Sequence, residues 1–397
     1  MASGSRGSGG AAEVFVQALG LGLTSFGGPI AHIGYFERAY VRRLGWLDHA
    51  AFARLFALVQ ILPGPASSQL GCLIGYVRAG VPGALAAWLG FTLPSALLLY
   101  AFARIVPASP GAVAAGAMHG LKLAALAIVA QAVVAMARRL RGAAQAVIAA
   151  CVAGTLIAFE GAWIGIAAIA AGAVAGAFAC RDAKAIALVG EGSIGRRGAA
   201  LALALFAALA LVLGVAALAV PHGRLALAAS FFRAGALVFG GGHVVLPLLH
   251  DALEPAWMGD DAFLAGYGAA QAVPGPLFSV AAYYGAVAHA PAGDAGTAAL
   301  ALVALFAPGL LLAIAGLRVL DAIAALPRAA GAIAGVDAAV VGLLAAAGYA
   351  PVFTTSVRDI GDAAAALLAF VLLERLRWPP LAAVVLMVAF SAARVLA

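Results

Sequence analysis

The sequence predicts an all-α polytopic membrane protein, built as an inverted-topology internal repeat with broken or re-entrant helices at its FGGP and PGP motifs. Three observations predict this fold: an apolar composition, a series of membrane-length segments, and motifs that occur twice in the same order. Of the 397 residues, 65% are hydrophobic and 10% are charged, whereas a soluble domain has about 25% charged residues. So few charges leave the surface of a soluble protein uncovered, which excludes an ordinary soluble enzyme.

The charge pattern argues against nucleic-acid binding, and the cysteines predict no metal site. The net charge is +7, but the arginines stand in short clusters between apolar segments rather than in a stripe that follows phosphates. We interpret these clusters as topology signals. Cys72, Cys151 and Cys180 lie far apart in apolar sequence, so they predict neither a metal site nor a disulfide framework. We interpret them as small buried side chains and expect no cofactor.

Several apolar segments approach the roughly 20 residues that a helix needs to span the hydrocarbon. They are 81–104, 113–137, 143–160, 161–180, 199–220, 298–317, 329–349, 363–377 and 379–396. Residues 1–10 are rich in glycine and serine and predict a disordered N-terminal tail. We expect a first transmembrane repeat at 11–180, a cytoplasmic loop and linker transmembrane helix at 181–223, and a second repeat at 224–397.

Two further apolar segments are interrupted by helix-breaking residues. Segment 12–40 is broken by Phe26-Gly27-Gly28-Pro29, and segment 50–78 by Pro63-Gly64-Pro65. Proline lacks an N–H and glycine is a poor helix former, so the helix should unwind at both sites. Because unwound backbone at membrane depth needs protein or water around it, these breaks are the most informative features of the sequence.

Both breaks recur in the second part of the chain. The motif QxxPGP stands at 60–65 and again at 271–276, an offset of 211 (271 − 60). The FGG motif stands at 26–28 and at 239–241, an offset of 213, and Gly120 corresponds to Gly335 at an offset of 215. Two motifs repeated in the same order at nearly equal spacing predict an internal duplication.

The charges of equivalent loops predict that the two halves have opposite orientation. Loop 37–48 carries three arginines, whereas its counterpart, 251–261, carries four acidic residues and no lysine or arginine. Under the positive-inside rule this pattern is typical of inverted halves, and the extra segment 199–220 supplies the inversion. Re-entrant hairpins at the breaks place the N-terminus in the cytoplasm and the C-terminus outside. Full spans give the same ends but leave 37–43 outside, so we favour hairpins.

The breaks are also the candidate substrate site. A helix that restarts inside the membrane points unpaired N–H groups and a partial positive charge at the midplane, which suits an anion. A tight bend that serves only packing is the alternative. The candidate substrate-binding residues are Gly27, Gly28, Gln60, Pro63, Gly64, Pro65, Ser67 and Ser68 in the first half, and Gly240, Gly241, Gln271, Pro274, Gly275, Pro276 and Ser279 in the second.

Two pairs of ionisable residues accompany the breaks. His32 and His243 follow the Gly-rich motifs and are candidates for proton coupling, although a structural histidine bonded to backbone carbonyls is equally plausible. Lys122 and Asp337 correspond at an offset of 215 and are candidates for an ion pair between the repeats. The alternative for Lys122 is a side chain that reaches the membrane interface.

With FGGP followed by His32, FGGGHVVLP at 239–247 and two QxxPGP motifs, the chain resembles the chromate ion transporter family in its long, two-half form. The resemblance covers nearly the whole chain. It implies export of chromate across the bacterial inner membrane, driven by the proton-motive force, with sulfate as a structural analogue. The second half has Gly242 for Pro29 and Leu277-Phe278 for Ala66-Ser67, so we expect the first half to contribute more to binding.

Alternatives to chromate export remain open at this point. Chromate and sulfate share charge and shape, so a transporter of sulfate or another oxyanion fits the same residues, as does a passive anion channel. A membrane-embedded enzyme would need a nucleophile with its base or a redox cofactor site, and the scattered cysteines argue against it. Membrane lipid and protons are the other expected partners, and the sequence leaves a homo-oligomer open.

Overall fold

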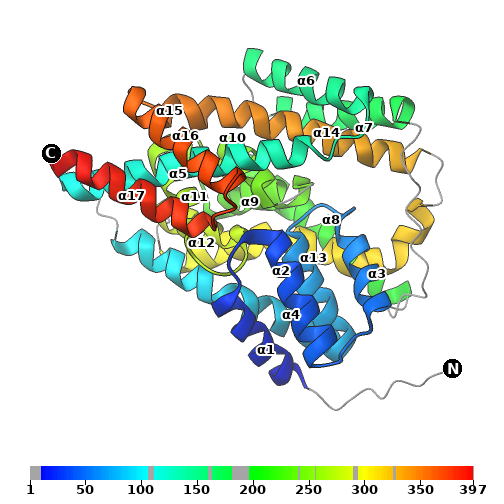
Figure 1. The fold of residues 1–397 in the computed structure, drawn as a ribbon. Helices are drawn as coiled ribbons and strands as arrows, with labels where there is room; N and C mark the ends of the chain where they lie inside the picture. The colour runs from blue at the N-terminus through cyan, green and yellow to red at the C-terminus, as the bar shows by residue number, and fades with distance from the viewer. Residues whose placement is uncertain are drawn as a thin grey trace.

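The computed structural model describes residues 10–105, 111–159, 163–180, 196–239, 242–254, 256–288, 294–324 and 328–396. All regular secondary structure in these ranges is helical (Figure 1), so the predicted all-α fold is confirmed. The predicted tail lies outside the described residues apart from Gly10, as does most of the predicted loop at 181–195.

The first half contains seven α-helices in its described residues. They are α1 (Ala11–Thr24), α2 (Gly28–Phe36), α3 (His49–Val59), α4 (Ala66–Ile105), α5 (Ala112–Ala137), α6 (Ala143–Ala158) and α7 (Ile164–Ala179). A π-helical turn, Glu37–Arg43, continues α2. The helix that links the halves, α8 (Arg196–Ala219), lies where the apolar segment 199–220 predicts it and is mostly exposed.

The second half repeats this order. Its α-helices are α9 (Arg224–Leu237), α10 (Val245–Leu253), α11 (Asp260–Ala270), α12 (Val280–Val287), α13 (Ala295–Ala324), α14 (Ala329–Ala347), α15 (Thr354–Ser356), α16 (Ile360–Glu374) and α17 (Pro380–Leu396). Short 3-10 turns, Gly242–Val244 and Leu277–Ser279, precede α10 and α12, and a π-helical turn, Gly348–Phe353, follows α14.

Among the described residues, five helices are long and apolar enough to cross a membrane: Ala66–Ile105, Ala112–Ala137, Arg197–Ala219, Ala295–Arg318 and Ala329–Ser356. The other predicted spans form α6, α7, α16 and α17, with 15 to 17 residues each. At 1.5 Å per residue these helices are about 24 Å long, slightly less than the hydrocarbon core.

The predicted breaks are present, and α4 contains a further reversal of the chain. Ala79 and Gly80 have non-helical backbone angles, and a Cβ on Gly75 would lie 2.3 Å from the carbonyl oxygen of Gly83. In one straight helix, residues eight apart are separated by about 12 Å. Therefore α4 consists of two antiparallel arms, 66–78 and 81–105.

The segment 50–78 folds as a hairpin whose tip is the Pro-Gly-Pro motif. Arg78, at the end of the first arm of α4, lies over the ring of Trp46 at 5.1 Å and pairs with Glu13 at 3.0 Å. Trp46 comes three residues before α3 begins. The two ends of the segment are thus together, and the tip at 60–65 lies away from them, as the hairpin interpretation expects.

The two halves are interlocked and follow the repeat. Gly120 on α5 packs against the backbone of Met387 on α17, with 2.4 Å from an added Cβ to the carbonyl oxygen. Gly335 on α14 packs in the same way on Gly172 of α7, at 2.1 Å. Both members of each pair correspond at an offset of 215 (335 − 120 and 387 − 172), so the contacts are related by pseudo-twofold symmetry.

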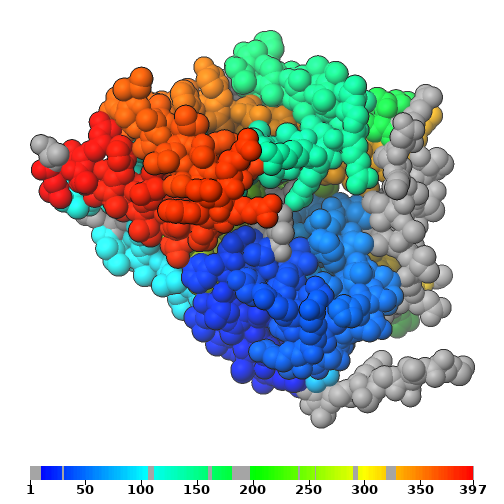
Figure 2. Space-filling view, in the orientation of Figure 1, coloured from blue at the N-terminus to red at the C-terminus, as the bar shows by residue number. Residues whose placement is uncertain are grey.

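The ribbon agrees, since α14 lies beside α6 and α7 while α17 lies beside α5 (Figure 1). In the view of Figure 2 the C-terminal helices, in orange and red, border the blue N-terminal helices. The main buried core joins residues of α5, α9, α11 and α13. Each half is therefore completed by helices of the other.

Candidate functional site

The two Pro-Gly-Pro breaks bond to each other's halves. The N–H of Gly64 donates to the carbonyl of Val238 at 2.6 Å, and the N–H of Gly275 donates to the carbonyl of Ser25 at 2.9 Å. Gly275 corresponds to Gly64, and Val238 corresponds to Ser25 at the offset of the FGG motifs. Each break is thus fixed to the chain next to the FGG motif of the opposite half, and both breaks lie where the halves meet.

Both positions need glycine. Gly64 and Gly275 have φ of +127° and +101°, which side chains of L-residues rarely adopt. A Cβ on Gly64 would be 2.8 Å from the Cα of Gly309, and one on Gly275 would be 2.9 Å from Ser95 Oγ. The motif therefore combines a strained turn with close approach to a helix of the other half, which a simple bend would not require.

The polar residues after the two breaks differ in their hydrogen bonds. In the first half, Gln69 Nε2 donates to the carbonyls of Pro63 at 2.8 Å and Gly309 at 2.9 Å. Ser68 Oγ is buried without a partner in the described residues, and Ser67 is also buried. In the second half, Ser279 Oγ is bonded to Ser95 Oγ at 2.7 Å. Ser68 is thus an unpartnered donor at the start of a half-helix, and its counterpart Ser279 is not.

A cavity of about 120 Å³ lies at the first break. Its polar lining comes from four elements: Gln60 and Gly64 at the break, Arg139 in the turn after α5, Gln145 on α6, and Asp337 on α14. Gln60 and Arg139 are exposed, so the cavity reaches the surface on their side. This volume is several times the roughly 30 Å³ of one water molecule, so a small anion has room there.

Both histidines have structural partners. His32 is buried, and its Nε2 donates to the Ser25 carbonyl at 3.2 Å, while its Nδ1 has no partner in the described residues. His243 Nδ1 is hydrogen-bonded to the hydroxyl of Tyr267 at 2.7 Å. Neither histidine is among the residues that line the cavity. Their role in proton coupling stays a prediction.

The expected pair between Lys122 and Asp337 is wrong. Lys122 Nζ donates to Asp261 at 2.6 Å and to the carbonyl of Thr355 at 3.1 Å, whereas Asp337 lines the cavity. The physical reason is geometric. Residues related by a twofold axis meet only if they lie on that axis, and Lys122 lies off it, against α11.

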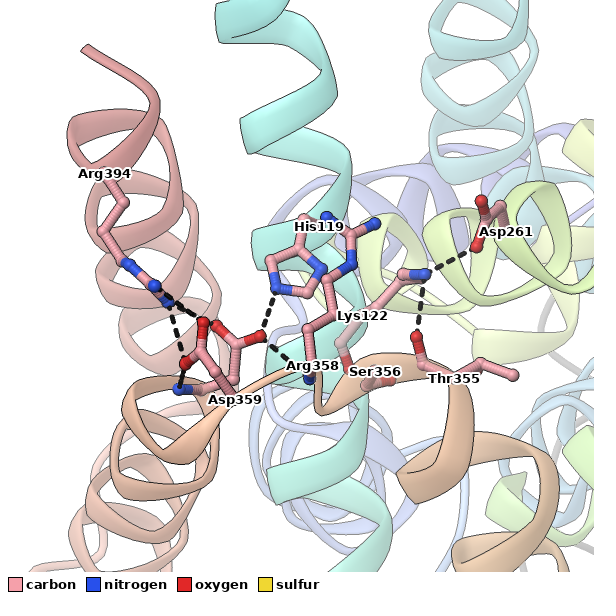
Figure 3. A network of polar contacts seen from close by, with 9 residues as sticks. His119, Lys122, Asp261, Thr355, Ser356, Arg358, Asp359 and Arg394 are labelled. Carbon is pink, nitrogen blue, oxygen red and sulfur yellow. Dashed lines mark hydrogen bonds and ion pairs between the residues drawn. The ribbon is translucent and has the colours of Figure 1, made fainter. Parts of the chain in front are cut away.

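Lys122 belongs to a network between the halves (Figure 3). On the same face of α5, His119 Nε2 donates to the buried Asp362 at 2.9 Å, and Arg394 at the end of α17 donates to Asp362 at 2.8 Å and to Asp359 at 2.7 Å. Hydrogen bonding to Arg394 lowers the pKa of Asp359 to about 2. The network joins α5 to the segments around α11, α15 and α17.

The contact between α11 and α5 is closed, whereas the equivalent contact between α3 and α14 is open. Gly268 on α11 lies so close to α5 that a Cβ would be 2.4 Å from the Leu121 carbonyl oxygen, and the Lys122–Asp261 pair adds to this contact. The counterparts of α11 and α5 are α3 and α14. There, residues of α3 and α14 line the cavity instead. One contact is closed and the other is open.

The remaining predicted residues have the following positions. Gly27 and Gly28 have positive φ, and Gly27 caps α2. Pro63 and Pro65 flank Gly64, and Pro274 and Pro276 flank Gly275. Gln271 Nε2 is buried with no partner in the described part of the chain. Gly240 and Gly241 lie outside the described residues. The substrate roles of all these residues stay predictions.

Sequence reasoning missed Arg139, Gln145 and Asp261. Arg139 belongs to a cluster that we interpreted only as a topology signal. Its position directly after the apolar segment that contains Lys122 was the one sequence feature that could have indicated a role in binding. A possible metal-binding group was also missed. His250, Glu254 and Asp260 offer ligand atoms within 4.8 Å of one another, but His250 Nε2 is already bonded to Asp260 at 2.6 Å.

Comparison with known proteins assigns the chain to a family. The model of the chromate transporter family matches twice, at residues 12–177 and 225–393. A chromate transport protein of Pseudomonas aeruginosa is 30% identical over 338 residues, which is 84% of this chain and 79% of the relative. One of Cupriavidus metallidurans is 30% identical over 368 residues, 90% of this chain and 86% of the relative.

A probable chromate transport protein of Synechococcus elongatus is 41% identical over 83 residues, which cover 21% of each chain. No solved structure matches this chain. The two matches of one family model correspond to the two halves that the repeated motifs define, and the long relatives match over most of their length. The chain is a membrane protein that belongs to the chromate transporter family.

Proposed function

We propose that this protein is a secondary transporter that exports chromate from the bacterial cytoplasm across the inner membrane, coupled to the proton gradient. Three features support the proposal: the family, the names of its long relatives, and a polar cavity at a broken helix. The observation that carries it is the reciprocal bonding of Gly64 and Gly275, because it brings two helix breaks to the boundary between inverted halves.

The first break would bind the oxyanion. Its half-helix begins at Ala66, which lines the cavity, so the N–H groups of the first turn are the nearest donors. The hydroxyls of Ser67 and Ser68 follow directly in the chain, but they are buried and do not line the cavity in this conformation. Gln60 adds an amide, and Arg139 attracts an anion towards the cavity. Backbone donors recognise charge and tetrahedral shape, which is why sulfate should compete with chromate.

Charge distribution orients the molecule in this proposal. The turn that holds Arg138, Arg139 and Arg141 and the arginine-rich segment 37–43 face the cytoplasm under the positive-inside rule. The N-terminus is then cytoplasmic and the C-terminus outside. The cavity at Arg139 opens to the cytoplasm, and the Lys122–Asp261 contact closes the opposite side.

The unequal helix contacts fit alternating access. In a transporter built from inverted repeats, the outward-open state is obtained when the two halves exchange conformations. In this protein the two halves would exchange conformations if α3 packed against α14 and α11 separated from α5. In this proposal α3/α14 and α11/α5 are equivalent contacts, one in each half of the protein, and one is open while the other is closed.

The test is chromate flux into proteoliposomes, with and without an imposed pH gradient. We expect saturable flux that the gradient stimulates and sulfate inhibits, and that the double substitution Pro63→Ala and Pro274→Ala abolishes. Pro82→Ala, at an exposed position on the second arm of α4, is the matched control and should transport normally. Flux that ignores the pH gradient would contradict proton coupling and favour a channel or another coupling ion. Absence of flux of either oxyanion, from folded protein, would overturn the proposed substrate.

A further inference from the structure

Asp337 is a carboxylate without a hydrogen-bond or ion-pair partner among the described residues. It lies on α14, eight residues after the helix begins, and lines the cavity at the first break. Neither Asp337 nor Arg139 forms a hydrogen bond or ion pair through its side chain with another described residue. By contrast, Lys122 and Asp362, which are buried in the same protein, are both paired.

The surroundings of Asp337 contain one opposite charge and several neutral polar groups. Arg139, in the turn after α5, is the other charged residue of the cavity lining; Gln60 from the break and Gln145 from α6 are amides. The face of α14 that contacts α7 is made of small residues, since Gly335 packs on Gly172 and Gly176, and brings no titratable group. An anion that enters this cavity therefore meets Arg139 and Asp337 together.

A divalent oxyanion and an ionised Asp337 repel each other in so small a volume. A proton on Asp337 removes that repulsion and turns the carboxyl group into a hydrogen-bond donor. Since linkage is reciprocal, the bound anion must then increase the affinity of Asp337 for its proton by the same factor. Arg139 supplies the attraction in both protonation states, because its guanidinium stays charged.

We propose that the cavity between Arg139 and Asp337 binds a divalent oxyanion together with one proton, which Asp337 carries. The proposal rests on the proposed function for the class of substrate, and it adds the site of the proton and the sign of the coupling. Anion and proton occupy the site together and leave with one net negative charge, so the membrane-potential part of the proton-motive force, which is negative inside, drives export. No bond of the oxyanion is made or broken.

The experiment measures sulfate binding to the purified full-length protein in lipid nanodiscs by titration calorimetry. Sulfate keeps both charges between about pH 5.5 and about pH 8, whereas chromate itself takes up a proton in that range, so sulfate isolates the titration of the protein. Titrations in buffers of different ionisation enthalpy report the protons taken up on binding. Chromate is measured in parallel at the higher pH.

We expect wild-type affinity to rise about tenfold or more as the pH falls, with uptake of close to one proton at the higher pH. Asp337→Asn should bind sulfate at every pH as tightly as the wild type does at low pH, without proton uptake. Arg139→Gln should weaken binding at all pH values and keep the pH dependence. Arg138→Gln and Glu374→Gln are the controls, because those two residues pair with each other outside the cavity.

Two results separate failure of this inference from failure of the proposed function. If the wild type binds sulfate but Asp337→Asn keeps the same pH dependence and proton uptake, the assignment of the proton to Asp337 is overturned and oxyanion transport stands. If folded wild type binds neither sulfate nor chromate, the proposed function fails and this inference fails with it. Thermal unfolding of each variant shows whether the substitutions leave the protein folded.

Discussion

Lys122 on α5 and Asp261 at the start of α11 form an ion pair of 2.6 Å that joins the two halves of the protein. The lysine side chain is 4% exposed and the aspartate 76% exposed, so the pair connects the interior to the solvent. A buried ammonium needs such a partner, because desolvation without compensation is costly. The repeat counterparts of these residues are Asp337 and Ala50, which form no such pair, and the cavity lies beside Asp337.

Breaking this pair should destabilise the closed contact. Asp261→Asn leaves the buried Lys122 with the Thr355 carbonyl alone, and the additional substitution Lys122→Met should recover part of the loss. In a double-mutant cycle we expect a coupling of about 1–3 kcal/mol from thermal or denaturant unfolding. Asp260→Asn is the neighbouring control, since Asp260 bonds to His250 instead. Additive effects of the two substitutions would show that the pair does not hold the contact.

We predict that the Arg394–Asp359 pair makes the stability of the protein depend on pH in the acidic range. Hydrogen bonding to Arg394 holds the folded pKa of Asp359 at about 2, below its ordinary value of 3.8. A lowered pKa contributes stability that is present above pH 4 and is lost as the pH falls towards 2. The difference in melting temperature between wild type and Arg394→Gln should therefore be full at neutral pH and disappear towards pH 2. A difference that stays constant down to pH 2, as expected for the exposed control Arg375→Gln, would contradict this assignment.

Glycine at the two breaks should be indispensable. Gly64→Ala and Gly275→Ala combine a positive φ with a Cβ that meets the opposite half within 3 Å. We expect each to lower the free energy of unfolding by about 1–3 kcal/mol and to abolish sulfate binding. Gly154 and Gly214, on helices with open space around them, are the matched controls, and alanine there should be neutral or slightly stabilising. If both variants bind sulfate normally, the breaks are not part of the substrate site.

The sequence predicted the features that depend on local chemistry. Pro82, Pro94 and Pro308 lie inside helices, so proline alone does not mark a break. The repeated FGG and PGP motifs made the breaks at 26–29 and 60–65 predictable, and the apolar segments made the span positions predictable. The repeat offsets also identified residues in equivalent positions, because the contacts Gly120–Met387 and Gly335–Gly172 are related by the same offset. The exchange of α17 and α7 between halves was not predictable, since it depends on which surfaces meet after folding.

The prediction for Lys122 failed because equivalence in a repeat was taken as proximity. Asp337 was identified as the repeat counterpart of Lys122, but the charged residue that shares its cavity, Arg139, comes from a cluster that we interpreted as a topology signal alone. The asymmetry between the halves was equally hidden. Aligning the sequences of the two halves identifies the residues that they share. It does not show that the same helix contact is closed in one half and open in the other.

Ser68 and Ser279 offer a direct test of which half binds the anion. They correspond in the repeat, but Ser68 Oγ has no partner in the described residues, whereas Ser279 Oγ is bonded to Ser95. Ser68→Ala should leave stability within about 0.5 kcal/mol of the wild type and weaken sulfate binding several-fold, because a free donor to the substrate is lost. Ser279→Ala should cost about 1 kcal/mol of stability and change binding little, because it removes a structural hydrogen bond. Calorimetric binding and thermal unfolding of both variants check this, and equal loss of binding would mean that the two halves contribute alike.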